Sequence, residues 1–232
     1  MSSRYYLLLY NLLSLLAWIY LTVHVSSHFT TSFTTTAKAA EDEEKAAALR
    51  TEVSIVTAVQ STAALEILHA VLDLVRASPG AAAVQIGGRN LVVWTVVRRF
   101  PELFIIVGSH DGYGSGKDGY GPTALRTCLL AWGCSDVLRY ALFVAVSLWG
   151  RAPAWLRWLR YTAFIVLYPI GFLSEASLVY LSLVKATGIG PFYRGYLFVG
   201  LLTYIPASYF LYTYMFSQRR RALSQTNRVK NT

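Results

Sequence analysis

The chain has 232 residues, of which 55% are apolar and only 14% are charged, and its formal net charge is +9. So low a charged fraction excludes an ordinary soluble domain, in which about a quarter of the residues are charged. The positive charge is typical of a membrane protein that faces anionic headgroups or an anionic substrate. No nucleic-acid-binding module is recognisable, so we expect no nucleic acid partner.

Apolar stretches of about 20 residues, the length of a membrane-spanning helix, recur along the chain. They predict an all-α fold, a bundle of six transmembrane helices within a single integral membrane domain, residues 1–232. No A-x-A cleavage site follows the first stretch, so we expect it to remain in the mature protein. The expected spans are 5–25, 52–76, 84–107, 124–149, 159–184 and 193–216.

Polar segments separate these spans. The segment 37–50 is charged and has helical propensity, and we expect it to form a solvated polar loop; the glycine-rich tract 108–121 is expected to be a flexible loop. The sequence QRRRA near the start of the tail 217–232 predicts a cytoplasmic C-terminus by the positive-inside rule. An even number of spans then places the N-terminus on the cytoplasmic side as well.

Several ionisable side chains fall within the expected spans. Each is a candidate functional residue because a charge inside the bilayer is costly, although pairing between helices explains such residues equally well. Acids outnumber arginines in this set, so we expect at least one carboxyl to be protonated. The set that could face one bundle interior comprises Glu66, His69, Asp73, Arg89, Asp136, Arg139 and Glu175.

Tyr168 and Glu175 lie in the fifth expected span, within the sequence LYPIGFLSE. Seven residues of helix turn through about 700° and rise about 10.5 Å, so the two side chains share one face. A phenol and a carboxyl placed in this way could act on a small substrate as general acid and general base. Pro169 and Gly171 between them favour a kink. The alternative is structural: Tyr168 hydrogen-bonds a neighbour and Glu175 pairs with an arginine.

Other chemistries find little support. Glu66 and His69 form one E-x-x-H motif, whereas carboxylate-bridged di-iron bundles need this motif twice. The two cysteines lie six residues apart and form neither a disulfide framework nor a CxxC motif. Ala70 stands where the loop of tyrosine phosphatases has its nucleophilic cysteine, and no serine has a partnered histidine and aspartate. We therefore expect no metal, no cofactor and no hydrolase site.

Five segments of the chain carry a family resemblance. In order along the sequence they are YLLLYN, LEILHAVLDLVRASP, QIGGRNLVVW, AWGCSDVLRY and LRYTAFIVLYPIGFLSE. Together they resemble the membrane-bound very-long-chain (3R)-3-hydroxyacyl-CoA dehydratases, also called protein tyrosine phosphatase-like proteins. The chain departs from the usual family pattern at Ala70, Asp73, Gly88 and Asp136, where the family usually has cysteine or a small residue, glycine, serine and glutamate.

The resemblance implies a hydro-lyase of the endoplasmic reticulum membrane that converts a very-long-chain (3R)-3-hydroxyacyl-CoA into a trans-2-enoyl-CoA, the third step of fatty acid elongation. It implies Tyr168 and Glu175 as the catalytic pair, one removing the proton on C2 and the other protonating the leaving hydroxyl on C3. Tyr168 is the expected base and Glu175 the expected acid, with the reverse division left open. The supporting polar residues are Glu66, His69, Arg89, Asp136 and Arg139.

Arginines at the cytoplasmic side are candidates to bind the phosphates of CoA, namely Arg76, Arg157, Arg160 and the cluster from Arg219 to Arg221. The alternative is that they only fix topology on anionic lipid. The expected partners are the acyl-CoA substrate, membrane lipid, and the condensing enzyme and reductases of an elongation complex. The alternative function is a non-catalytic membrane scaffold or a small transporter, in which the intramembrane charges hold helices together or relay protons.

Overall fold

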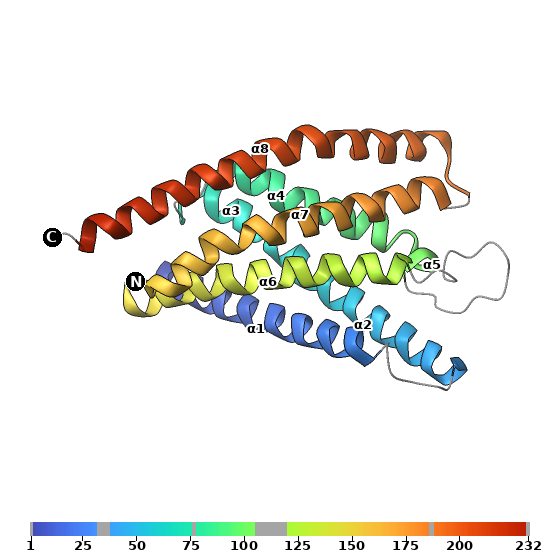
Figure 1. Cartoon of the computed structure of the whole chain (residues 1–232), viewed down its shortest axis with the longest axis horizontal. Helices are drawn as coiled ribbons and strands as arrows, with labels where there is room; N and C mark the ends of the chain where they lie inside the picture. The colour runs from blue at the N-terminus through green and yellow to red at the C-terminus, as the bar shows by residue number, and fades with distance from the viewer. Residues whose placement is uncertain (1, 32–37, 76–77, 105–119, 186–187, 231–232) are drawn as a thin grey trace.

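The computed structural model describes residues 2–31, 38–75, 78–104, 120–185 and 188–230. In these residues the fold is all-α, as the sequence predicts. Six helical rods in this part of the chain form a bundle, and consecutive rods run in alternating directions (Figure 1). The rods are α1, α2 with α3, α4 with η1, α6, α7 and α8. Both chain ends therefore lie at the same end of the bundle. The helices are α1 (Ser2–Thr31), α2 (Lys38–Ala63), α3 (Leu65–Val71), α4 (Pro79–Val92), α5 (Pro101–Phe104), α6 (Tyr120–Trp149), α7 (Ala154–Lys185) and α8 (Pro191–Lys230), with a π-helix, η1 (Val93–Val97), continuing α4.

Five helical stretches are long and apolar enough to cross a membrane. They are Ser3–Phe29, Glu43–Val71, Tyr120–Trp149, Ala154–Lys185 and Pro191–Ala222.

The third expected span, 84–107, falls on α4, η1 and α5, which are not among these five stretches. The helix begins earlier than expected, because Pro79 occupies its first turn and the Ser78 side chain accepts a hydrogen bond from the backbone N–H of Ala81. Its polar residues, Gln85 among them, lower its hydropathy.

Of the expected polar loop 37–50, residue 37 lies outside the described residues, and residues 38–50 instead form the first half of α2. Alanine, glutamate and lysine are strong helix formers, and Ala46, Ala48 and Leu49 are buried in the bundle, so helix replaces loop. Of the other expected loop, 108–121, residues 108–119 lie outside the described residues and the last two begin α6. The tail continues α8 without a break as far as Lys230.

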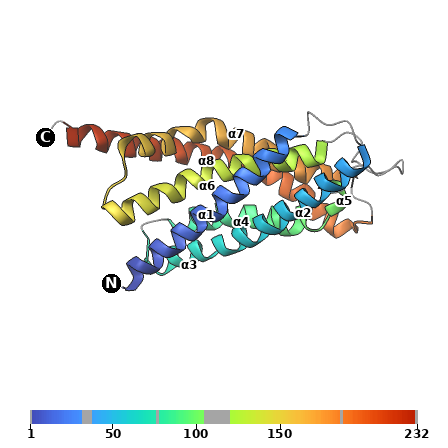
Figure 2. The ribbon, with the colours of Figure 1, turned by 90° about the horizontal axis from the view of Figure 1, so that it is seen from below.

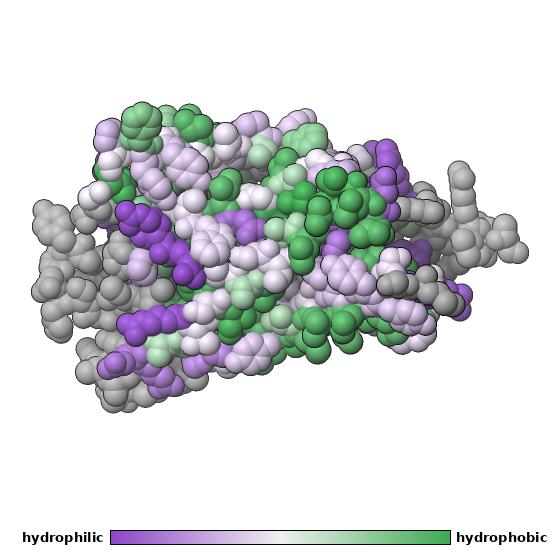
Figure 3. Space-filling model, turned by 180° about the vertical axis from the view of Figure 1, so that it is seen from behind, coloured by the Kyte–Doolittle hydropathy of each residue, from purple (hydrophilic) through white to green (hydrophobic). Residues whose placement is uncertain are grey.

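Helix α6 is the centre of the bundle. It packs along α1 on one side and along α7 on the other, while α8 packs along α7 (Figures 1 and 2). Gly133 of α6 lies so close to Thr22 of α1 that a Cβ there would collide with the threonine hydroxyl. Strongly hydrophilic residues lie mainly toward the ends of the face shown in Figure 3, with hydrophobic residues between them, as expected for a surface that contacts lipid.

Asp73 lies two residues past the end of the membrane-spanning stretch Glu43–Val71, whereas the expected span continued to residue 76. Helix α3 ends at Val71, and Asp73 is exposed with a φ of 52°. The Leu74 N–H donates to the His69 carbonyl (2.9 Å) and the Asp73 N–H donates to the Ala70 carbonyl (3.4 Å), which is the Schellman arrangement with Asp73 at its left-handed position. A left-handed position favours glycine. Because Asp73 is exposed and follows the end of α3, its charge does not lie between packed helices.

Replacing Asp73 by glycine should raise the free energy of unfolding by roughly 0.5–1 kcal/mol, because the left-handed conformation carries no Cβ penalty in glycine. Thermal unfolding in detergent measures the effect. The control is Val71→Gly, at an exposed residue in the last turn of α3, which should lower the melting temperature. Equal destabilisation by both substitutions would contradict the role assigned to the Asp73 backbone.

Candidate active site

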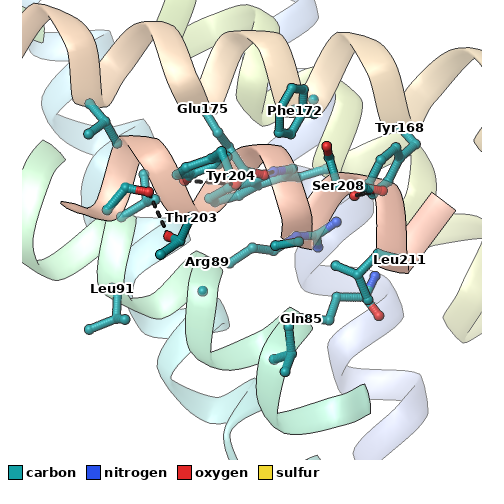
Figure 4. A pocket seen from close by; sticks show the side chains of 18 of the residues that line it. Gln85, Arg89, Leu91, Tyr168, Phe172, Glu175, Thr203, Tyr204, Ser208 and Leu211 are labelled. Carbon is teal, nitrogen blue, oxygen red and sulfur yellow. Dashed lines mark hydrogen bonds between the residues drawn. The ribbon is translucent and has the colours of Figure 1, made fainter. Parts of the chain in front are cut away.

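A cavity with a volume of about 520 Å³ lies between α4, α6, α7 and α8. Tyr168 and Glu175 both line it from α7, so the shared helical face predicted from their spacing points into one space (Figure 4). Arg89 lines the cavity from α4 and Tyr204 lines it from α8. Pro169 lies inside α7, which is helical on both sides of it.

The carboxyl group of Glu175 accepts two hydrogen bonds from neighbouring helices. The indole N–H of Trp132 in α6 donates to Oε1 (2.6 Å), and the hydroxyl of Tyr204 in α8 donates to Oε2 (3.3 Å). Within the described part of the chain, no arginine lies within salt-bridge distance of Glu175. Arg89 contacts one of the two donors: its guanidinium lies 5.0 Å from the centre of the Trp132 ring. Two neutral donors therefore hold Glu175, and Arg89 makes a cation–π contact with one of them, Trp132.

Tyr168 is held mainly by its ring. The ring is stacked on Phe172 and Tyr212, with centroid distances of 6.4 Å and 5.5 Å. Its hydroxyl donates a long hydrogen bond to the backbone carbonyl of Ser208 in α8 (3.3 Å). This neighbour is the kind that the structural alternative predicted for Tyr168. A bond of this length leaves the hydroxyl free to exchange its partner for a substrate oxygen.

A second polar cluster lies beside the cavity and joins α3, α4 and α6. Arg139 pairs with Glu66 and, through its Nε, with Asp136 (2.9 Å), and the hydroxyl of Tyr140 donates to Glu66. Asp136 also pairs with Arg89 (2.6 Å), which therefore belongs to both the cluster and the cavity. Here two carboxylates meet two guanidiniums, so this cluster is balanced without a protonated acid.

His69, which we expected to be a supporting residue, lies at the edge of this cluster. Its Nε2 is 2.9 Å from the hydroxyl of Tyr6, and the rings of Tyr6 and Tyr10 meet it edge-on. Among the described residues, no group of three or more histidine, cysteine, aspartate or glutamate side chains is placed to hold a metal ion. The histidine therefore has an aromatic and hydrogen-bonded environment.

Of the six arginines predicted to bind substrate, five lie in the described residues, and among these five Arg160 alone lines the cavity. Arg157 lies one turn earlier on α7 and is partly buried outside the lining. Arg219 is on α8, away from the lining, and its Nε is buried without a hydrogen-bond partner. Arg76 lies outside the described residues.

Sequence reasoning missed the two donors to Glu175. Trp132 lies in the segment AWGCSDVLRY, so the resemblance marked its surroundings, although nothing in the spacing of the residues linked it to Glu175. Tyr204 lies in α8, outside the five segments that carry the resemblance. Both contacts join residues that are far apart in the sequence, 43 and 29 positions from Glu175.

Comparisons with known proteins agree with one another. The sequence profile of the family "Protein tyrosine phosphatase-like protein, PTPLA" matches residues 60–225. Very-long-chain (3R)-3-hydroxyacyl-CoA dehydratase PASTICCINO 2 of Arabidopsis thaliana is 34% identical over 182 residues, covering 73% of this chain and 75% of the relative. A very-long-chain (3R)-3-hydroxyacyl-CoA dehydratase of Caenorhabditis elegans is 26% identical over 99% of this chain and 100% of its own. The human dehydratase 2 is 30% identical, with 74% of this chain and 66% of the relative covered. No solved structure matches the chain.

Proposed function

The chain belongs to the protein tyrosine phosphatase-like family, PTPLA, and from this premise we propose that it is a hydro-lyase that dehydrates very-long-chain (3R)-3-hydroxyacyl-CoA to trans-2-enoyl-CoA. This reaction is the third step of the fatty acid elongation cycle. The observation that carries the proposal is the placement of Tyr168 and Glu175 on one face of α7, lining one cavity. Dehydration needs such a pair, because a weakly acidic proton and a poor leaving group must be handled together.

Glu175 is the proposed base and Tyr168 the proposed acid, the reverse of the division first expected from the sequence. The hydrogen bonds support this reversal, because a carboxylate accepts from both Trp132 and Tyr204, and the phenol of Tyr168 already acts as a donor.

In the proposed step, Glu175 takes the proton from C2, which leaves the electrons of that C–H bond in the enolate of the thioester, and these electrons then form the C2=C3 double bond. The C3–O bond breaks, and its oxygen takes the phenolic proton of Tyr168 and leaves as water. The proton on Glu175 then returns to the phenolate, which restores both groups for the next turnover. The reaction is redox-neutral overall, because the opposite changes at C2 and C3 cancel, so it needs no oxidant or reductant.

Arg160 is the proposed contact for the charged part of the substrate. It lines the same cavity as the catalytic pair and precedes Tyr168 by eight residues, a rise of about 12 Å along α7. A guanidinium at this end suits a phosphate or the polar pantetheine arm of CoA, while the reacting carbons lie deeper. Arg157 and the cluster from Arg219 to Arg221 are on the same end of the bundle and are proposed to act at longer range.

We place the protein in the endoplasmic reticulum membrane, with both termini cytoplasmic and with the condensing enzyme and the reductases of elongation as partners. The two termini lie at one end of the bundle, and that end carries the arginine cluster of α8 (Figure 1). Epitope tags at the two ends should both be digested by protease added to sealed microsomes. Protection of either tag would overturn this orientation.

Turnover by the purified chain in detergent tests the proposed function. The full chain is incubated with a very-long-chain (3R)-3-hydroxyacyl-CoA, and the trans-2-enoyl-CoA is measured by mass spectrometry. Formation of the enoyl product at a rate that is proportional to the amount of protein is the expected result. A folded protein that forms none of it would support the scaffold or transporter alternative instead.

A further inference from the structure

The cavity has an unsealed side between α4 and α8. Helix α8 packs along α7, but in the described part of the chain α4 is not among the helices closely packed against it. Leu91 of α4 and Val199 of α8 both line the cavity, yet 54% and 57% of their surface is exposed. Residues that face a cavity and the outside at once mark an opening, and this one faces the side of the bundle that contacts lipid.

The two ends of the cavity along α7 are not open to lipid in this way. Beyond the catalytic pair, Val179 is the last residue of α7 in the lining, only four residues and about 6 Å past Glu175. There α8 is tied to η1: the Tyr193 hydroxyl donates to the Thr95 carbonyl, and the Tyr196 hydroxyl lies 3.0 Å from Thr95 Oγ1. The opposite end carries Arg160, which suits the charged part of the substrate.

A very long acyl chain does not fit into the closed end. The hydrocarbon core of a bilayer is about 30 Å thick, so an ordinary lipid chain reaches about 15 Å, and a very-long chain reaches further. With the pantetheine arm near Arg160 and C2 and C3 at the catalytic pair, only about 6 Å of cavity remains along α7. The rest of the chain must leave sideways.

Two glycines make room for this exit. Gly88 of α4 and Gly200 of α8 both line the cavity, and a Cβ added at either would meet nothing within 4 Å. The neighbouring lining residues Leu91 and Val199 are apolar, as an aliphatic chain requires. We propose that the seam formed by Gly88, Leu91, Val199 and Gly200 is a lateral portal through which the acyl chain of the substrate passes from the cavity into the bilayer. The proposal rests on the proposed dehydratase function and explains how one short cavity serves very long chains.

Filling the seam tests the portal by kinetics. Gly88→Leu and Gly200→Leu should lower kcat/KM for a very-long-chain substrate at least about tenfold while changing that for a short-chain 3-hydroxyacyl-CoA less than about twofold. The matched controls are Gly87→Leu on α4 and Gly195→Leu on α8, which have equally open surroundings but do not line the cavity. Equal losses on both substrates, or no loss on either, would overturn the portal.

A second measurement needs no turnover, so it separates failure of the portal from failure of the dehydratase assignment. A benzophenone side chain is placed at Leu91 or at Leu9, which lies on α1 away from the cavity and is 57% exposed. With a saturated very-long-chain acyl-CoA as probe, Leu91 should be cross-linked well above Leu9, and a short-chain acyl-CoA should compete poorly for this capture. Equal labelling at the two positions would show adventitious contact with the probe and overturn the proposal, whether or not the protein is active.

Discussion

Glu175→Gln and Tyr168→Phe proteins should each turn over a 3-hydroxyacyl-CoA about 10²–10⁴-fold more slowly than the parent chain, the range that a positioned general acid or base contributes. The amide keeps the shape of the carboxyl group but cannot take the C2 proton. Phenylalanine keeps the stacked ring on Phe172 and Tyr212 but has no proton to give. The kcat of purified protein in detergent, with melting temperature measured alongside, gives the result.

The matched controls are Tyr209→Phe and Glu44→Gln, which make the same chemical changes at exposed residues outside the cavity. Both should keep the kcat of the parent chain. Folded Tyr168 and Glu175 variants with parental turnover would show that the pair is structural, as in the alternative first weighed for these residues.

Exchange of the C2 proton with deuterated water separates the two roles. If Glu175 is the base, the Tyr168→Phe protein should still exchange this proton although it cannot expel the hydroxyl, whereas the Glu175→Gln protein should not exchange it. The opposite pattern would restore the division first expected, with Tyr168 as the base.

Local patterns in the sequence predict local facts well. The apolar stretches predict the long helices, and the seven-residue spacing of Tyr168 and Glu175 predicts that they share a face, because helix geometry depends only on neighbours along the chain. Contacts between helices do not follow from spacing, so the donors Trp132 and Tyr204 were not found.

The other wrong predictions arose because backbone conformation and burial cannot be read from a hydropathy pattern. The expected span that contains Asp73 continues past the end of α3, so the sequence predicts a charge inside the membrane. The left-handed backbone of Asp73, which ends the helix, does not show in a hydropathy pattern. The charges of segment 37–50 predict a solvated polar loop, but residues 38–50 form helix, because alanine, glutamate and lysine favour helix and several of their apolar neighbours are buried.

Arg139 is the residue whose loss should most destabilise the bundle. Its guanidinium pairs with Glu66 of α3 and Asp136 of α6, and the three side chains are 18%, 15% and 5% exposed. The Arg139→Met substitution removes the charge and keeps a long apolar side chain, so two poorly hydrated carboxylates lose a partner together. Removing one member of a buried ion pair costs about 3–5 kcal/mol, because the remaining charge is uncompensated.

Thermal unfolding in detergent should therefore show a large fall in melting temperature for Arg139→Met. The matched control is Arg50→Met at an exposed arginine of α2, which should change the free energy of unfolding by less than about 0.5 kcal/mol. Adding Glu66→Gln to Arg139→Met should restore part of the loss, because the double variant no longer buries that unpaired carboxylate. Equal effects of the Arg139 and Arg50 substitutions would mean that the cluster contributes little to stability, and its arrangement around Arg89 would then have to be explained by the cavity alone.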